Sequence, residues 1–256
     1  MRFSAKFAGA VLGVAGAGLL MAPLAAQAAP RVDVDEVVGS LGLTPEPADY
    51  VLLVDTSGSM NTGGRYGQVR NQLRQLLAGL DADDRVSLLT FDSTVVKRYR
   101  GEVGPNPDAV LSHLPAQASG DYTDIGAAID GGLTQLESAD THRLAALILI
   151  TDGVMDTVPT AKYAKVDSAS WKKLRTRAAS LGQYHQLAAY AVSLISTTDA
   201  GLLKKAVPQA SEVGADEVGT RFAQVAGDLV RLQAAKALKD ELAAPIKVTF
   251  AGNLGA

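Results

Sequence analysis

Five side chains that carry oxygen atoms stand where apolar segments of the sequence begin or end: Asp55, Ser57, Ser59, Thr123 and Asp152. Together they offer two carboxylates and three hydroxyls, with no sulfur and no imidazole. Hard cations such as Mg²⁺ prefer oxygen ligands, accept neutral hydroxyls and keep several water molecules. The residue types therefore predict a site for one divalent cation, Mg²⁺ or Mn²⁺, built from three separate loops.

The first three of these residues follow a strand that we expect to be buried. Residues 51–54 are all apolar, and Asp55, Ser57 and Ser59 come next, in a stretch of small residues that ends the strand. A helical pattern begins after residues 61–64, with apolar residues spaced three and four apart. In open α/β sheets, ligands bind outside the carboxyl ends of the strands, and this connection places the three side chains there.

The D-x-S-x-S spacing that starts at Asp55 resembles the metal-ion-dependent adhesion site of the von Willebrand factor type A family. That family completes its site with a threonine that opens a later helix and an aspartate after a later buried strand. Thr123 and Asp152 match these two positions in the same order, and the resemblance covers roughly residues 49–237. It implies a Rossmann-like fold and a bound cation with one coordination position open to a carboxylate of a partner protein.

The other apolar segments predict a doubly wound α/β fold. Further buried strands are expected at residues 85–91, 144–150 and 186–195, and residues 94–99 are expected to pair with the first of these as an antiparallel edge strand. Helical patterns alternate with the strands, and the longest covers about residues 216–242. We therefore expect a mostly parallel sheet of about six strands with one antiparallel edge strand and helices on both faces.

Residues 1–28 carry a pattern of their own. They combine a basic start, a long uncharged stretch and a small-x-small cleavage signature, which is typical of a secretory signal peptide cleaved near Ala28. An uncleaved membrane anchor is the alternative, because the uncharged run is long enough to span a bilayer. We expect a secreted or extracytoplasmic protein that touches a membrane only if this segment is retained.

The rest of the chain divides into three parts. Residues 29–48 form a lead-in linker, residues 49–242 form the domain that holds the predicted site, and residues 243–256 form a tail. Within the tail, Ile246–Phe250 alternates like a strand. This strand is expected to pair at the sheet edge, or to begin a further region of a longer protein.

Composition argues against several classes of function. Removal of residues 1–28 takes away two bases and no acids, so the formal charge changes from −3 to −5 and nucleic-acid binding gains no support. The chain has no cysteine and therefore no disulfide. His113, His142 and His185 lie away from the strand ends that form the predicted site, so neither zinc binding nor nucleophilic catalysis is indicated. We do not expect an enzyme.

The favoured function is an exported protein-binding module, for adhesion or assembly, whose bound cation captures an exposed Asp or Glu of a partner. One alternative is a non-catalytic accessory subunit of a metal- or ATP-dependent enzyme complex, although the chain lacks the phosphate-binding loop of an ATPase. The other is a flavodoxin-like binder of phosphate or FMN, which also uses a hydroxyl-rich loop after its first strand. Asp55 and Asp152 argue against it, because they would repel a phosphate.

Selectivity for a partner is expected to come from the loop after Asp152, residues 153–167. This loop carries Met155, Lys162 and Tyr163, a mixture of apolar and basic side chains that suits an acidic segment with a hydrophobic neighbour. The alternative is that the apolar residues attach the loop to the body of the domain.

Overall fold

The computed structural model describes residues 46–138, 140–196, 198–214 and 217–243. All of these described residues belong to one compact unit. The predicted signal peptide, most of the predicted linker and the predicted strand Ile246–Phe250 lie outside the described residues. Within the described ranges, no helix combines the length and the apolar character needed to cross a membrane.

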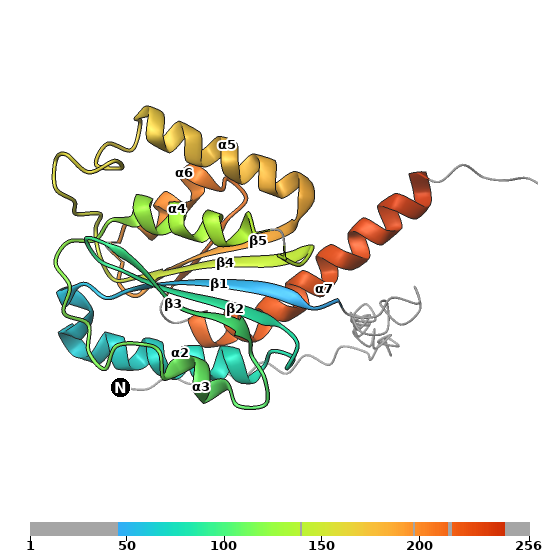
Figure 1. Cartoon of the computed structure of the whole chain (residues 1–256), viewed down its shortest axis with the longest axis horizontal. Coiled ribbons are helices and arrows are strands. Elements are labelled where there is room, and N and C mark those ends of the chain that lie inside the picture. Colours follow the sequence, from blue (N-terminus) through green and yellow to red (C-terminus); the bar gives the residue numbers. More distant parts are fainter. Residues whose placement is uncertain (1–45, 139, 197, 215–216, 244–256) are drawn as a thin grey trace, which may run out of the picture. The chain divides into compact units, whose positions relative to one another are not determined.

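In the part of the chain that the structure describes, six strands form one sheet in the order β3-β2-β1-β4-β5-β6 (Figure 1). Their bounds are Ala48–Asp55 (β1), Arg85–Phe91 (β2), Val95–Glu102 (β3), Leu144–Thr151 (β4), Gln186–Ser193 (β5) and Ser211–Gly214 (β6). Neighbouring strands are parallel except β2 and β3, which form an antiparallel pair at one edge. The predicted architecture is thereby confirmed.

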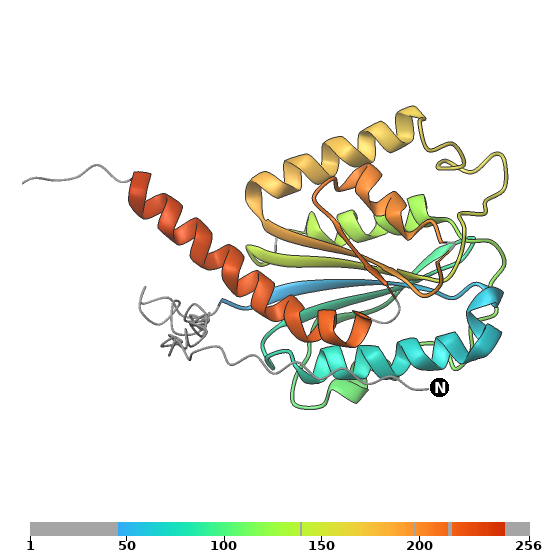
Figure 2. The same cartoon turned by 180° about the vertical axis from the view of Figure 1, so that it is seen from behind.

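Helices cover both faces of the sheet: α4, α5 and α6 lie on one face, and α2, α3 and α7 on the other (Figures 1 and 2). Their bounds are Arg65–Ala78 (α2), Pro107–Leu111 (α3), Ile125–Leu136 (α4), Ala169–Tyr184 (α5), Leu203–Ala206 (α6) and Val218–Ala243 (α7). Two short 3-10 helices, Gly58–Gly64 (η1) and Ala200–Leu202 (η2), precede α2 and α6.

The two faces of the sheet produce two hydrophobic cores. In β1, Tyr50, Leu52 and Val54 belong to the core on the side of α2 and α7, whereas Val51 and Leu53 belong to the core on the side of α4 and α5. Every residue of β1 and of β4 is buried. Because helices cover both faces of these central strands, their sequences are nearly continuous apolar runs.

Two features differ from the expectations of the sequence. The edge strand β6 was not predicted, because Val213 is the only buried residue among its four and the segment has no apolar run. Helix α4 is capped by Asp124, not by Thr123: the Asp124 carboxylate accepts a hydrogen bond of 2.8 Å from the backbone N–H of Ala127. The helix cap therefore leaves the Thr123 hydroxyl available for another partner.

Candidate functional site

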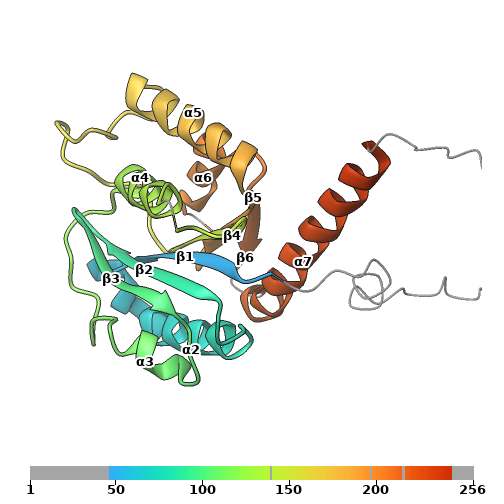
Figure 3. The same cartoon turned by 45° about the vertical axis from the view of Figure 1, so that its right-hand side comes forward.

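The predicted site lies where the winding of the sheet changes direction. β1 pairs with β2 on one side and with β4 on the other, and the chain continues to opposite faces after β1 and β4 (Figure 3). In open α/β sheets a ligand-binding crevice forms at such a point, outside the carboxyl ends of the strands. Asp55 ends β1 and Asp152 directly follows β4, so both carboxylates lie at this crevice.

Asp55 is a buried carboxylate with fixed orientation. The residue is 0% exposed. Its carboxylate accepts hydrogen bonds from the Ser57 backbone N–H at 2.8 Å and from the Thr151 hydroxyl at 2.5 Å. Burial raises the pKa of Asp55 to about 6, against the lowering effect of these hydrogen bonds. A buried carboxylate that is held in place but poorly compensated is a strong ligand for a cation, since a cation removes the cost of burying its charge.

The two serines connect Asp55 to Asp152 through a chain of hydroxyls. Ser57 Oγ lies 3.1 Å from Ser59 Oγ, and Ser59 Oγ donates a hydrogen bond of 2.8 Å to Asp152 Oδ1. Ser57 and Asp152 are buried, whereas Ser59 is exposed. The mouth of the site is therefore at Ser59.

Thr123 completes the arrangement from a third loop. A Cβ atom at Gly153 would lie 3.2 Å from Thr123 Oγ1 and 3.5 Å from Asp55 Oδ2, so both oxygens border one small space that glycine leaves open. Thr123 itself is 5% exposed. A hydroxyl beside a carboxylate, at the space that Gly153 leaves open, fits a bound cation.

Backbone hydrogen bonds hold the three loops together. The first loop pairs with the second through Gly58 N–H to Gly120 O and Gly120 N–H to Thr56 O, both at 2.9 Å. The second loop pairs with the third through Thr123 N–H to Asp156 O at 2.7 Å and Asp156 N–H to Thr123 O at 3.1 Å. The three loops that carry the predicted ligand side chains are thus joined by main-chain hydrogen bonds.

Arg65 is a member of the site that the sequence did not reveal. It begins α2, and its Nη1 lies 2.7 Å from Asp152 Oδ2, in an ion pair that covers one side of the carboxylate. A basic residue in the first turn of a helix is disfavoured by the helix dipole, which is the signal that could have drawn attention to it. The site therefore holds a cationic side chain of its own beside Asp152.

Exposed apolar residues stand in two of the loops that form the site. Tyr122 is 43% exposed, Val154 is 58% exposed and Val158 is 42% exposed, and all three stand in the two loops that carry Thr123 and Asp152. Tyr122 also has a φ angle of 66°, in the left-handed region that bulky residues rarely adopt. Strained and exposed aromatic residues gather at functional sites, so this rim is a candidate contact surface.

The predicted partner loop needs one correction. Tyr163 is 2% exposed: it packs against Gly126 of α4, and its ring meets Trp171 edge-on with the centroids 6.2 Å apart. It therefore attaches the loop to the body and presents no surface to a partner. Met155 is partly buried against the same core. Lys162 is exposed, but its ammonium pairs with Asp130 at 2.9 Å.

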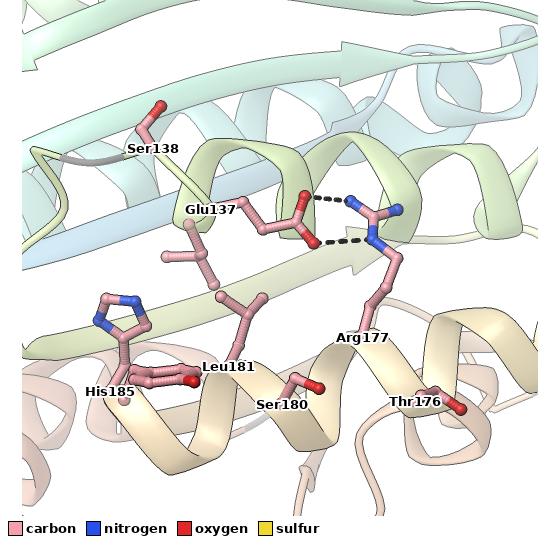
Figure 4. Close-up of a pocket in the computed structure, with 9 residues that line it drawn as sticks. Glu137, Ser138, Thr176, Arg177, Ser180, Leu181 and His185 are labelled. Carbon is pink, nitrogen blue, oxygen red and sulfur yellow. Dashed lines mark hydrogen bonds and ion pairs between the residues drawn. The ribbon is translucent and has the colours of Figure 1, made fainter.

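A separate hollow of about 490 Å³ lies between the carboxyl-terminal ends of α4 and α5 (Figure 4). Its polar wall is an ion pair in which Arg177 makes two contacts of 2.8 Å with Glu137, and His185 stands at its far end. His185 precedes β5, so this hollow is at the amino-terminal edge of the strands and contributes no residue to the predicted site. His142 likewise precedes β4.

Comparisons with known proteins agree with this architecture. Residues 50–154 match the family model of the von Willebrand factor type A domain, and this segment includes every predicted ligand residue. This part of the chain is therefore similar to the von Willebrand factor type A domain. A comparison with curated proteins gave no sequence match.

Solved structures share the fold of this chain at low sequence identity. A von Willebrand factor type A protein from Catenulispora acidiphila has 13% identity and a TM-score of 0.56 over 72% of this chain and 43% of its own length. The pilus adhesin SpaC from Lactobacillus rhamnosus GG has 17% identity and a TM-score of 0.51, over 72% and 31%. The PilB minor pilin from Streptococcus sanguinis has 13% identity and a TM-score of 0.50, over 79% and 64%. The chain thus spans less than two thirds of each of these proteins.

Proposed function

We propose that this chain is an exported protein-interaction module that captures an acidic side chain of a partner through a bound divalent cation, Mg²⁺ or Mn²⁺. The observation that carries the proposal is the convergence of two carboxylates and three hydroxyls on one crevice, between β1 and β4, where the winding of the sheet changes direction. Residues 1–28 direct export in this proposal, and the low-identity likeness to a pilus adhesin and a minor pilin supports a role in adhesion or assembly.

Five residues would hold the cation: Asp55, Ser57, Ser59, Thr123 and Asp152. A cation held there would supply a positive charge that attracts a carboxylate of the partner. Asp55 and Asp152 bring the formal negative charge that attracts the cation, and the hydroxyls bring neutral oxygens. Because neutral ligands withdraw little of the charge of the cation, it keeps its attraction for a further carboxylate.

The rim formed by Tyr122, Val154 and Val158 would add the apolar part of the contact. These side chains are exposed within the loops that carry two of the five ligands. Apolar and aromatic residues around one polar anchor are typical of protein-binding surfaces. A partner segment with an acidic residue next to an apolar one fits this combination.

Cation binding should depend on Asp152 and not on acidic charge in general. Asp152→Ala is expected to weaken Mg²⁺ binding by at least about tenfold, because it removes a ligand carboxylate. Asp156→Ala is the matched control: this exposed aspartate is four residues away and contributes only its backbone to the loop pairing. Titration calorimetry on the full chain measures both, and equal affinities in the two variants would contradict the proposal.

Capture of a carboxylate can be tested with a pair of short peptides that differ only in a central Glu or Gln between leucines. The Glu peptide should bind in Mg²⁺ and not in EDTA, and the Gln peptide should bind at least about tenfold more weakly, because a neutral amide is a poorer ligand for the cation. Val154→Ser should weaken Glu-peptide binding by about three- to tenfold through loss of apolar contact.

Val96→Ser is the control for the peptide experiment, because Val96 is an exposed valine of β3, at the sheet edge rather than in the loops around the site. Fluorescence anisotropy of labelled peptides gives the affinities. Equal binding of the Glu and Gln peptides would exclude the carboxylate as the recognised group.

A further inference from the structure

Asp152 is paired on both of its carboxylate oxygens. The Ser59 hydroxyl donates to Oδ1, and the Arg65 guanidinium contacts Oδ2 at 2.7 Å. The Asp152 side chain is 0% exposed, whereas the Arg65 side chain is 24% exposed. Arg65 Nη1 also lies 3.4 Å from the backbone oxygen of Ser59, the residue at the mouth of the site. The guanidinium thus stands between a buried ligand carboxylate and solvent.

We propose that Arg65 is a second carboxylate-binding residue of this site: it neutralises Asp152 when the cation is absent, and pairs with the partner's carboxylate when the cation is bound. This inference rests on the proposed function and adds the group that would select the partner. A carboxylate of the partner would then meet two positive charges, that of the metal and that of the guanidinium.

The position of Arg65 is not explained by the stability of α2. It is the first residue of that helix, where the helix dipole favours acidic residues, and the first turn of α2 has no acidic residue. The preceding turn places it there through Gly63 and Gly64, whose φ angles of 63° and 73° suit glycine. This position of Arg65 is unfavourable for the helix but allows the pair with the buried Asp152. We therefore connect it with the function of the site.

Competition with the metal follows from charge. With Arg65 in place, the formal charge of the two site aspartates and the guanidinium together is −1 instead of −2, and a cation that binds beside Asp152 meets a positive group only a few ångströms away. Metal binding should therefore displace the guanidinium from Oδ2. Arginine then offers a planar fork of donors that matches a carboxylate, which a lysine ammonium lacks.

The test uses Arg65→Met in the full chain, with Mg²⁺ alone and with the Glu peptide as probes. Loss of the resident charge should strengthen Mg²⁺ binding about five- to tenfold by calorimetry. In saturating Mg²⁺, the same variant should bind the Glu peptide about tenfold more weakly, because one of the two cations is gone. Arg65→Lys keeps a positive charge, so its Mg²⁺ affinity should lie between those of the wild type and Arg65→Met. Its affinity for the Glu peptide should remain close to that of Arg65→Met, because an ammonium lacks the planar fork of donors.

Arg74→Met is the matched control, because Arg74 lies on the same helix and pairs with the exposed Asp108 at 2.7 Å, away from the site. It should change neither affinity. If Arg65→Met leaves Mg²⁺ affinity unchanged or weakens it while Asp152→Ala still weakens it, Arg65 has only a structural role and the inference fails alone. If Mg²⁺ binds neither the wild type nor Arg65→Met, the proposed function and the inference fail together.

Discussion

Replacement of Asp55 by Asn should abolish measurable Mg²⁺ binding and, without metal, make the folded protein more stable at pH 7. The pKa of Asp55 is raised by burial to about 6, from an ordinary value of 3.8. A raised pKa means that the folded state favours the protonated carboxyl, so ionised Asp55 lowers stability as the pH rises from about 4 through 6. Asn carries no charge, so the variant avoids the cost of burying an ionised carboxylate. Its free energy of unfolding at pH 7 should therefore be about 1–3 kcal/mol higher than that of the wild type.

The hydrogen bonds at this position survive the change. An Asn oxygen can accept from the Ser57 backbone N–H, and its amide can donate to the Thr151 oxygen. The gain in stability of Asp55→Asn over the wild type should appear above about pH 5. It should vanish near pH 4, where the wild-type carboxyl is also neutral. Urea unfolding in EDTA at several pH values measures this dependence. A variant that is less stable than the wild type at pH 7 and equally so at pH 4 would contradict it.

Mg²⁺ should reverse the order of stability. The cation binds the folded wild type and raises its free energy of unfolding by mass action, but it has no equivalent site in Asp55→Asn. Addition of Mg²⁺ should thus raise the melting temperature of the wild type and leave that of the variant unchanged. A metal-dependent increase of equal size in both proteins would place the cation elsewhere.

Replacement of Tyr163 by Ala should destabilise the protein by roughly 3–5 kcal/mol and leave Mg²⁺ affinity within about twofold of the wild type. The backbone oxygen of Tyr163 accepts a hydrogen bond of 3.0 Å from the Nε1–H of Trp171. The Tyr163 ring is buried between Gly126 and Trp171. Its loss leaves a cavity where the loop after β4 is attached to α4 and α5. Urea unfolding in EDTA and calorimetry with Mg²⁺ measure the two effects separately.

Lys162→Ala is the control for this prediction. Its ammonium lies 4.8 Å from the centre of the Tyr163 ring and pairs with Asp130, but the side chain is largely exposed. Such surface pairs contribute less than about 1 kcal/mol, and Asp130 keeps its contact with Arg177 in the variant. If Tyr163→Ala proved as mild as Lys162→Ala, the loop would not depend on this ring for attachment.

The spacing of apolar residues and the apolar runs in the sequence were enough to predict the fold class. The apolar runs at β1 and β4, and the turns that follow them, predicted central parallel strands because only strands covered on both faces are apolar throughout. The same patterns placed Asp55 and Asp152 at strand ends, so the set of ligands could be proposed from the sequence alone. β6 could not be predicted this way: its short, mostly exposed edge segment gains its pairing from β5, not from its own residue pattern.

Only the tertiary structure decided what surrounds those ligands. The contact between Arg65 and Asp152 joins residues 87 positions apart, and no local pattern encodes a pair that forms when two loops meet. The same holds for Tyr163, whose apolar character in a long loop is equally compatible with a contact surface and with attachment. Its burial follows from the fit against Gly126, which lacks a side chain at that point. Local sequence sets which residues are available, and the packing of distant segments sets which of them face solvent.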